Sequence, residues 1–141
     1  MSNTSVVLVA IPTQREILQA LCDQAEIAAI VNPTRATMAD LPVPVFADWI
    51  SLEEYITPAV CCFLSPYAAL KKDLNRCLDK GIHVLSAGPI GLTHNEIETI
   101  NKKANDKELV LHFGGPYPFS RLFQQLKEQR QKPEFGQPVY L

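Results

Sequence analysis

The chain has 141 residues, of which 47% are hydrophobic and 20% are charged, and its net charge at pH 7 is −2. This length suits one domain that buries its own core without help from a metal or from disulfide bonds. The near-neutral charge excludes the strong positive field that marks a nucleic-acid or anionic-membrane partner. No apolar run approaches the roughly 20 residues of a membrane span.

Short apolar runs recur along the chain, and segments with a helical pattern separate them. Runs such as VVLVAI and AVCCFL do not alternate with polar residues, which is typical of parallel strands covered on both faces. Strands are therefore predicted at Val6–Ile11, Glu26–Val31, Val43–Phe46, Ala59–Leu64, Ile82–Leu85 and Leu109–Phe113.

Helix starts follow several of these strands. TQRE (Thr13–Glu16), SLEE (Ser51–Glu54) and THNE (Thr93–Glu96) each fit a capping box, and SPY (Ser65–Tyr67) places a proline after a capping residue. The helix after SPY is expected to stop at Gly81. Apolar stripes that mark the later helices are Leu70, Leu74 and Leu78, then Ile97, Ile100 and Ala104, then Leu122, Phe123 and Leu126.

The order of these elements is strand, helix, strand, repeated with short connections. It predicts a single doubly wound α/β domain over residues 1–132, with a mostly parallel sheet and helices on both faces, which is a Rossmann-like fold. Residues 133–141 are predicted to form a C-terminal extended tail with an apolar end, Val139–Leu141.

Cysteines and histidines give no sign of a metal site. The four cysteines, none of which forms a C-x-x-C pair, are Cys22, Cys61, Cys62 and Cys77. They are interpreted as small core residues of a reduced protein. The histidines, which lack metal-ligand spacing, are His83, His94 and His112. With an N-terminus, MSNTS, that has no signal-peptide pattern, a cytoplasmic location is expected.

Four segments are similar to motifs of the nucleotide-binding half of the Gfo/Idh/MocA oxidoreductases. They are CCFLSPY, KGIHVLSAGPIGLT, VLHFGGPYPFS and FGQPVYL. The family patterns that they resemble are a strand ending in a TP turn, GKHVLVEKPLALT, a strand ending in VG followed by RRFSP, and IGxPxYV, where the second domain of the family begins. The resemblance covers Val6 to Leu141, and it implies a Rossmann domain of the kind that binds NAD or NADP.

The first turn departs from the family pattern, which is G-x-G-x-x-G. Ala10, Pro12 and Arg15 stand at the three glycine positions. Pro12 has no amide hydrogen to offer a phosphate, and Arg15 is too bulky for a close contact between helix and strand. Thr13 and Glu16 are expected to cap the helix themselves, and Glu16 places a carboxylate where a pyrophosphate would lie. The alternative is that Arg15 contacts a phosphate.

Three further departures concern the ribose and the chemistry. Asn32 stands at the end of the second strand, where Asp or Glu usually holds the ribose hydroxyls. At the EKP motif, whose lysine the family uses near the reacting carbon, this chain has Ala87, Gly88 and Pro89. The second domain, which in the family carries most of the substrate pocket and a histidine-containing catalytic motif, has no counterpart in this sequence.

These departures predict a stand-alone, degenerate Rossmann-like domain that acts in binding, regulation or assembly, with no catalytic residue, no cofactor and no metal. Two alternatives stay open. The chain is an NAD- or NADP-dependent oxidoreductase, or a subunit of one, with an altered nucleotide site; or it binds another small ligand at the carboxyl ends of the strands. Candidate contact residues in that crevice are Pro12, Thr13, Arg15, Asn32, Ser65, Tyr67, Gly88 and Gly114.

The tail predicts self-association. Val139, Tyr140 and Leu141 form an apolar, strand-like end for which the sequence offers no partner in the same chain. Exposed apolar segments tend to be covered by association, and a two-fold dimer covers one without forming fibres. A homodimer is therefore expected, and a protein partner or a small ligand stays open.

Overall fold

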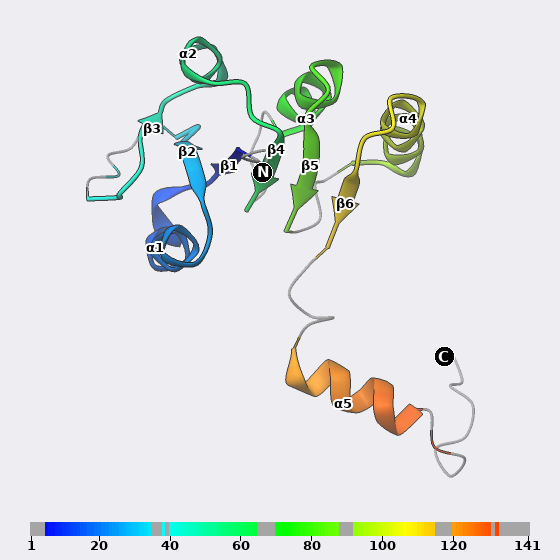
Figure 1. The fold of residues 1–141 in the computed structure, drawn as a ribbon. Helices are drawn as coiled ribbons and strands as arrows, with labels where there is room; N and C mark the ends of the chain where they lie inside the picture. Colours follow the sequence, from blue (N-terminus) through cyan, green and yellow to red (C-terminus); the bar gives the residue numbers. More distant parts are fainter. Residues whose placement is uncertain are drawn as a thin grey trace.

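The computed structural model describes residues 5–34, 38, 40–64, 70–87, 92–114, 120–130 and 132. Within them, six strands form one sheet in the order β3-β2-β1-β4-β5-β6, and every neighbouring pair is parallel (Figure 1). The strands are β1 (Val6–Val9), β2 (Ile27–Val31), β3 (Val45–Phe46), β4 (Val60–Phe63), β5 (His83–Ser86) and β6 (Leu111–Phe113). All six predicted strands are confirmed, with ends that differ by at most two residues.

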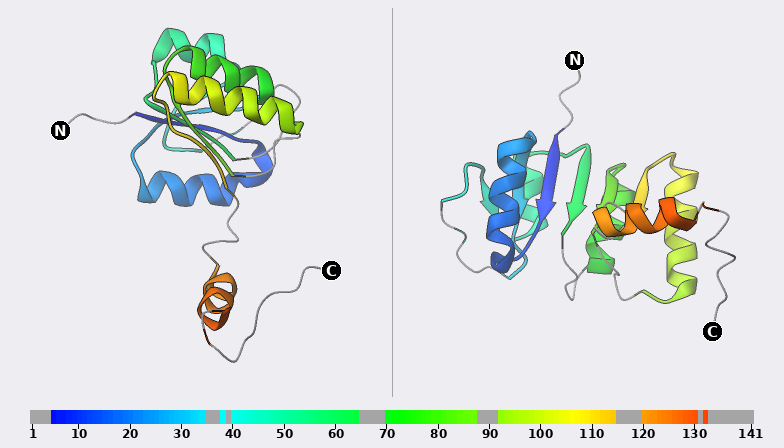
Figure 2. Two further views of the ribbon diagram at one scale, coloured as in Figure 1. Left: turned by 90° about the vertical axis from the view of Figure 1, so that its right-hand side faces the viewer. Right: turned by 90° about the horizontal axis from the view of Figure 1, so that it is seen from below.

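Helices cover both faces of this sheet. They are η1, a 3₁₀ turn (Pro12–Gln14), α1 (Arg15–Gln24), α2 (Trp49–Tyr55), α3 (Leu70–Asp79), α4 (His94–Asp106) and α5 (Arg121–Arg130). Right-handed crossovers place α1 on one face and α2, α3 and α4 on the other (Figure 2). The predicted Rossmann-like α/β fold is confirmed.

Successive side chains of a strand point to opposite faces of the sheet and pack in two different hydrophobic cores. In β1, Val7 belongs to the core beneath α2, α3 and α4, whereas Leu8 belongs to the core beneath α1. Cys61 and Cys77 are buried in the larger core as free thiols, and burial raises the pKa of the Cys61 thiol well above its ordinary value. The prediction that cysteines are core residues is confirmed at these two positions.

One of the predicted capping boxes is confirmed and another is wrong. At the start of α4, the Glu96 amide donates to Thr93 Oγ1 and the Thr93 amide donates to Glu96 Oε2, at 3.4 and 2.8 Å. At the start of α2, Ser51 is not the cap: its amide donates to Asp48 Oδ1 at 3.0 Å. The helix begins earlier than predicted because Asp48 caps it, and Trp49, its first residue, is buried in the core.

The ends of α3 and α4 share one geometry. Gly81 has φ +77°, its amide donates to the Leu78 carbonyl, and the Ile82 amide donates to the Cys77 carbonyl. This is the Schellman arrangement, and it confirms the predicted stop at Gly81. α4 ends with the equivalent pair of hydrogen bonds, from the Glu108 amide to the Asn105 carbonyl and from the Leu109 amide to the Ala104 carbonyl. Its residue in the left-handed region is Glu108, with φ +55°.

On the sheet face that α1 covers, the side chains of β5 and β6 are exposed. Leu8, Cys62, Leu85 and His112 lie in register on that face, one each from β1, β4, β5 and β6. Leu8 is buried under α1, whereas Leu85 is 39% exposed and His112 is exposed. Burial on this face therefore decreases from β1 toward β6.

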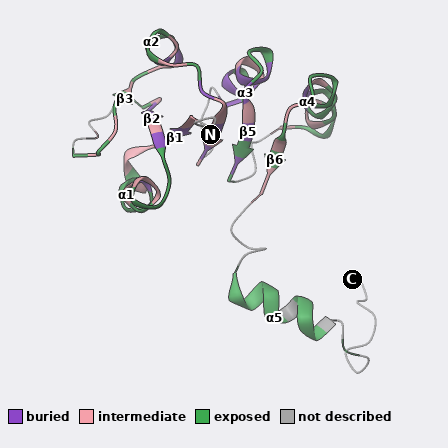
Figure 3. Cartoon of the chain, viewed as in Figure 1, coloured by how far each residue is buried: buried purple, intermediate pink, exposed green. Residues whose placement is uncertain are grey.

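Helix α5 stands apart from the sheet on the same side as α1 (Figure 1). Each of its described side chains is exposed (Figure 3), including Leu122 at 69% and Phe123 at 46%. The third residue of the predicted stripe, Leu126, has a side chain outside the described part, as does the whole of the predicted tail, residues 133–141. None of the helices within the described ranges has the length and apolar composition of a membrane span.

Candidate functional site

The carboxyl ends of the parallel strands meet at one edge of the sheet, where ligands bind in open α/β folds. The strand order reverses between β1 and β4, because the chain runs from β1 outward to β3 and then returns. At this switch point the turn after β1 lies beside Leu64, which follows β4, and Asn32, which follows β2. The sequence places the predicted crevice at this edge, and its role as a ligand site stays a prediction.

Gln14 closes the turn after β1. Its side-chain Oε1 accepts from the Ile11 amide at 3.3 Å, and its Nε2 donates to the Leu64 carbonyl oxygen at 2.9 Å. The backbone amide of Gln14 also donates to the Ile11 carbonyl oxygen. One side chain thus joins the first turn to the end of β4. Gln14 was not among the residues predicted from the sequence; the available signal was a glutamine three positions after the residue that begins the turn.

The predicted role of Thr13 as the helix cap is wrong. Thr13 is exposed in the middle of the 3₁₀ turn, and α1 begins two residues later, at Arg15. The reason is Pro12, whose fixed φ suits the first position of a helical turn, so the backbone is already helical when it reaches Thr13. Glu16 lies in the first turn of α1 and its carboxylate is exposed there, but its predicted capping role is wrong as well, since the side chain that reaches back to the start of the turn is that of Gln14.

Arg15 is turned toward the loop between β2 and β3. Its Nη2 atom pairs with Asp40 Oδ2 at 3.0 Å, and both side chains are largely exposed. Exposed pairs of this kind contribute about 0–1 kcal/mol, so the guanidinium is held only weakly. The alternative, in which Arg15 contacts a phosphate, is left untested by this pair.

Asn32 is buried and shapes the loop that follows β2. Its Oδ1 accepts from the amide and the hydroxyl of Thr34, at 3.1 and 2.7 Å, which forms an Asx turn. Its own amide donates to the Phe46 carbonyl oxygen at 2.8 Å and extends the pairing of β2 with β3. The acceptor oxygen predicted to face a ribose is therefore engaged within the loop.

Of the other candidate residues, the structure describes only Gly114. Ser65, Tyr67 and Gly88 lie outside the described residues. Gly114 follows β6, where its amide donates to the Ser86 carbonyl oxygen at 2.9 Å. A Cβ at Gly114 would lie 2.5 Å from His112 Nε2, so a larger residue there has to displace that imidazole. Gly114 is a packing position at the far side of the sheet.

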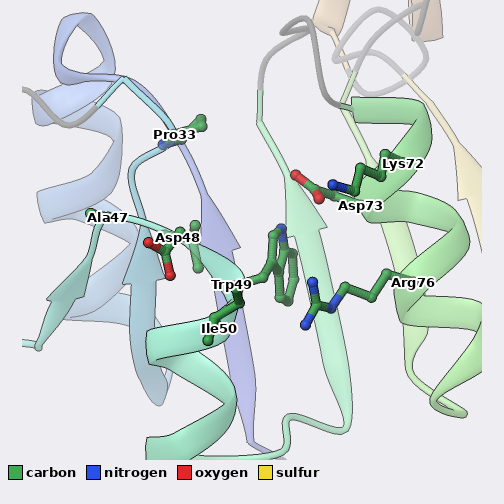
Figure 4. A pocket seen from close by; sticks show the side chains of 9 residues that line it. Pro33, Ala47, Asp48, Trp49, Ile50, Lys72, Asp73 and Arg76 are labelled. Carbon is green, nitrogen blue, oxygen red and sulfur yellow. The ribbon is translucent and has the colours of Figure 1, made fainter.

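A pocket of about 240 Å³ lies between α2 and α3, beyond the end of β2 (Figure 4). Val31, Pro33 and Trp49 supply apolar surface, and Trp49 stands between the two helices. Charged side chains of both signs line the rest of it: Asp48, Lys72, Asp73 and Arg76. This pocket was not predicted from the sequence.

A charged cluster braces the two helices beside the pocket. The Arg76 guanidinium donates twice to the Glu53 carboxylate, both at 2.7 Å, and Lys80 Nζ lies 2.8 Å from the same carboxylate. The hydrogen bonds from Arg76, reinforced by Lys80, lower the pKa of Glu53 below its ordinary value although partial burial opposes this. Among the described residues, no group of three or more His, Cys, Asp or Glu side chains is placed to hold a metal ion.

No protein-family model and no curated protein matches the sequence. Solved structures do match. The chain is similar to the WlbA dehydrogenase from Bordetella pertussis in complex with NADH and UDP-GlcNAcA, with TM-score 0.78 and 16% identity over 94% of this chain and 43% of that one. It is also similar to a dehydrogenase from Chromobacterium violaceum (TM-score 0.73, 22% identity, 97% and 43% of the two chains).

A third similar structure is GenD2 from gentamicin A biosynthesis in complex with NAD, with TM-score 0.73 and 17% identity over 95% of this chain and 40% of that one. The chain thus spans less than half the length of each of these three dehydrogenases. The fold that the sequence resemblance implied is confirmed: this chain shares its Rossmann-like α/β architecture with part of each of these dehydrogenases.

Proposed function

We propose that this chain is a Rossmann-like binding domain without hydride-transfer activity of its own, acting in ligand binding, regulation or assembly. The observation that carries the proposal is the closed turn after β1, where Gln14 accepts from Ile11 and donates to Leu64. In dinucleotide-binding domains the corresponding turn is lined by glycines, so that the backbone can approach the pyrophosphate.

The backbone of this turn has few N–H groups left for a phosphate. Ile11, Gln14 and Arg15 donate theirs within the turn, and Pro12 has none. Glu16 adds a carboxylate to the first turn of α1, where it opposes an incoming anion. A dinucleotide would have to displace the Gln14 side chain and lie close to a negative charge.

A second candidate function is an oxidoreductase, or a subunit of one, that binds NAD or NADP through an altered site. The observation in its favour is the fold likeness to structures solved with NADH and with NAD. In this candidate Arg15 leaves its exposed pair with Asp40 and meets a phosphate. Hydride transfer would still lack the lysine of the family motif, since Gly88 stands at that position.

Calorimetric titration with NAD, NADH, NADP and NADPH separates the two candidates. The binding-domain proposal expects no saturable binding to the unmutated chain. The Gln14→Gly variant removes the side chain that closes the turn. Any of the four nucleotides that binds measurably should therefore bind this variant more tightly than the unmutated chain. A micromolar dissociation constant for the unmutated chain, with cofactor-dependent turnover verified by product analysis, would establish the second candidate instead.

We also propose that the chain forms a homodimer. Leu122 and Phe123 of α5 are exposed, and Leu85 is exposed on the open face of the sheet. A ten-residue helix is marginal in water without packing, so α5 needs a surface to cover its apolar side chains. The open face of a second copy offers such a surface.

A cytoplasmic location is part of the same proposal. All four cysteines are free thiols, and two of them are fully inside the core. Free thiols in this number suit a reducing compartment.

A further inference from the structure

The indole N–H group of Trp49 donates no hydrogen bond to any residue that the structure describes. Trp49 is 5% exposed, and its Nε1 atom is buried with no hydrogen-bond partner among the residues that the structure describes. A buried donor without an acceptor carries the full cost of its lost hydration, and nearly all buried donors in native proteins have a partner. An acceptor from outside the protein would remove this cost.

Trp49, the residue that carries this donor, lines the pocket between α2 and α3. Figure 4 shows Trp49 among the lining side chains, with its nitrogen at the end of the ring that lies toward Asp73. The pocket volume, about 240 Å³, is below the roughly 300–1,000 Å³ of sites for drug-sized molecules. It suits a small metabolite and is too small for a dinucleotide.

The charges of the pocket are balanced and of both signs. Lys72 forms no ion pair or hydrogen bond with any residue in the described ranges, so its ammonium group is available to an anionic group. Asp73 lies next to it in the chain and is 8% exposed; a carboxylate has about four acceptor positions and can take a further donor. Arg76, in contrast, is engaged by Glu53.

We propose that this pocket binds a small zwitterion of the α-amino acid class. The ligand carboxylate accepts from the Trp49 indole and pairs with Lys72, and the ligand ammonium donates to Asp73. Pro33 and Val31 provide apolar surface for the rest of the molecule. The assignment rests on the proposed function of this chain as a binding domain and adds the class of ligand to it. Opposite charges close together favour a zwitterion over a simple anion, which the two carboxylates of the pocket would repel.

The chain offers a direct reporter, because Trp49 is its one tryptophan. Each of the twenty standard amino acids except tryptophan is titrated into ¹⁵N-labelled protein, and the single indole N–H signal is followed by NMR. The expected result for at least one of them is a saturable downfield shift of the indole proton as it gains an acceptor. If no amino acid at millimolar concentration moves this signal, the proposal is wrong.

Variants test the two charged partners. Lys72→Gln and Asp73→Asn are each expected to weaken the affinity for the best amino acid by at least about tenfold, the scale of one charge-assisted hydrogen bond. The matched control is Lys102→Gln, which removes an exposed lysine of α4 that has no ion pair within the described structure and should leave the affinity unchanged. Equal losses in all three variants would contradict the assignment.

Blocked ligands test the zwitterion itself. The N-acetyl derivative and the methyl ester of the best amino acid each lack one charge and are both expected to bind at least about tenfold more weakly. If acetate binds as well as the amino acid, the site recognises an anion and the proposed class is wrong. Binding of NADH, followed separately by calorimetry, would overturn the proposed function without bearing on this pocket.

Discussion

Gln14 and Leu64 are fifty residues apart in the sequence, and the side-chain amide of the first donates to the backbone carbonyl of the second at 2.9 Å. This hydrogen bond joins the turn after β1 to the end of β4, at the place where the strand order of the sheet reverses. Dinucleotides cross the sheet at such a switch point in Rossmann folds. In this chain the Gln14 side chain bridges the turn at that point.

Loss of the Gln14 side chain should destabilise the protein. Gln14→Ala leaves the Ile11 amide and the Leu64 carbonyl without their partner in a partly buried turn, so we expect a loss of about 1–3 kcal/mol in urea denaturation. Gln24→Ala, at the exposed end of α1, is the matched control and should change stability by less than about 0.5 kcal/mol. Equal midpoints for the two variants would show that the bridge contributes nothing.

Thr13 should tolerate substitution. Its side chain is exposed and caps no helix, so Thr13→Ala is expected to change the free energy of unfolding by less than about 0.5 kcal/mol. A residue that caps a helix would instead cost roughly 0.5–2 kcal/mol on loss of its hydroxyl. A loss in that higher range would mean that the hydroxyl accepts a backbone hydrogen bond after all.

The ends of α3 and α4 should both favour glycine at their left-handed position. Gly81→Ala forces a Cβ into the left-handed region and should destabilise the protein by about 1 kcal/mol. Glu108→Gly relieves the same strain at the end of α4 and should stabilise by up to about 1 kcal/mol. Thermal and urea denaturation of both variants measure this, and a change of the same sign in both would refute the shared geometry.

The Glu53 cluster should make stability depend on pH in the acid range. The pKa of Glu53 is lowered in the folded state, chiefly by its hydrogen bonds from Arg76, so its contribution is present above the unfolded pKa and is lost as the pH falls through the folded value. Urea denaturation at a series of acid pH values should therefore show a steeper decline for the unmutated protein than for Glu53→Gln.

At neutral pH, Glu53→Gln should cost on the order of 1 kcal/mol, because it weakens the bridge between α2 and α3. The control is Glu54→Gln, which removes the exposed neighbouring carboxylate, a group that forms no ion pair within the described part of the chain. If both variants follow the same pH profile, the cluster does not carry the effect.

Self-association should depend on the apolar side of α5. In sedimentation velocity at micromolar concentration we expect a dimer, and we expect Leu122→Glu with Phe123→Glu to shift it to monomer, since charge on that surface opposes burial. Gln125→Glu, an exposed change on the same helix, should leave the dimer intact. Removal of residues 133–141 is expected to weaken the dimer as well. A monomer of the unmutated chain at high concentration would rule the dimer out.

The local pattern of the sequence was enough for the strands, for the helix end at Gly81 and for the cap at Thr93. Each of these depends on residues within a few positions of one another: an apolar run, a glycine in the left-handed region, or a threonine followed three residues later by Glu96. Crossover connections between parallel strands are right-handed. The predicted order of strands and helices was therefore enough to predict a parallel sheet with helices on both faces.

Contacts between segments that are distant in the sequence could be seen only in the tertiary structure. Trp49, the first residue of α2, packs in a core formed by distant strands, and the nearby SLEE pattern contains no sign of that contact. The partner of Gln14 is a backbone carbonyl fifty residues away, and the pocket joins side chains of α2 to Lys72 of α3. Hydrogen bonds and pockets of this kind depend on which segments the sheet places side by side, and no short window of sequence includes both partners.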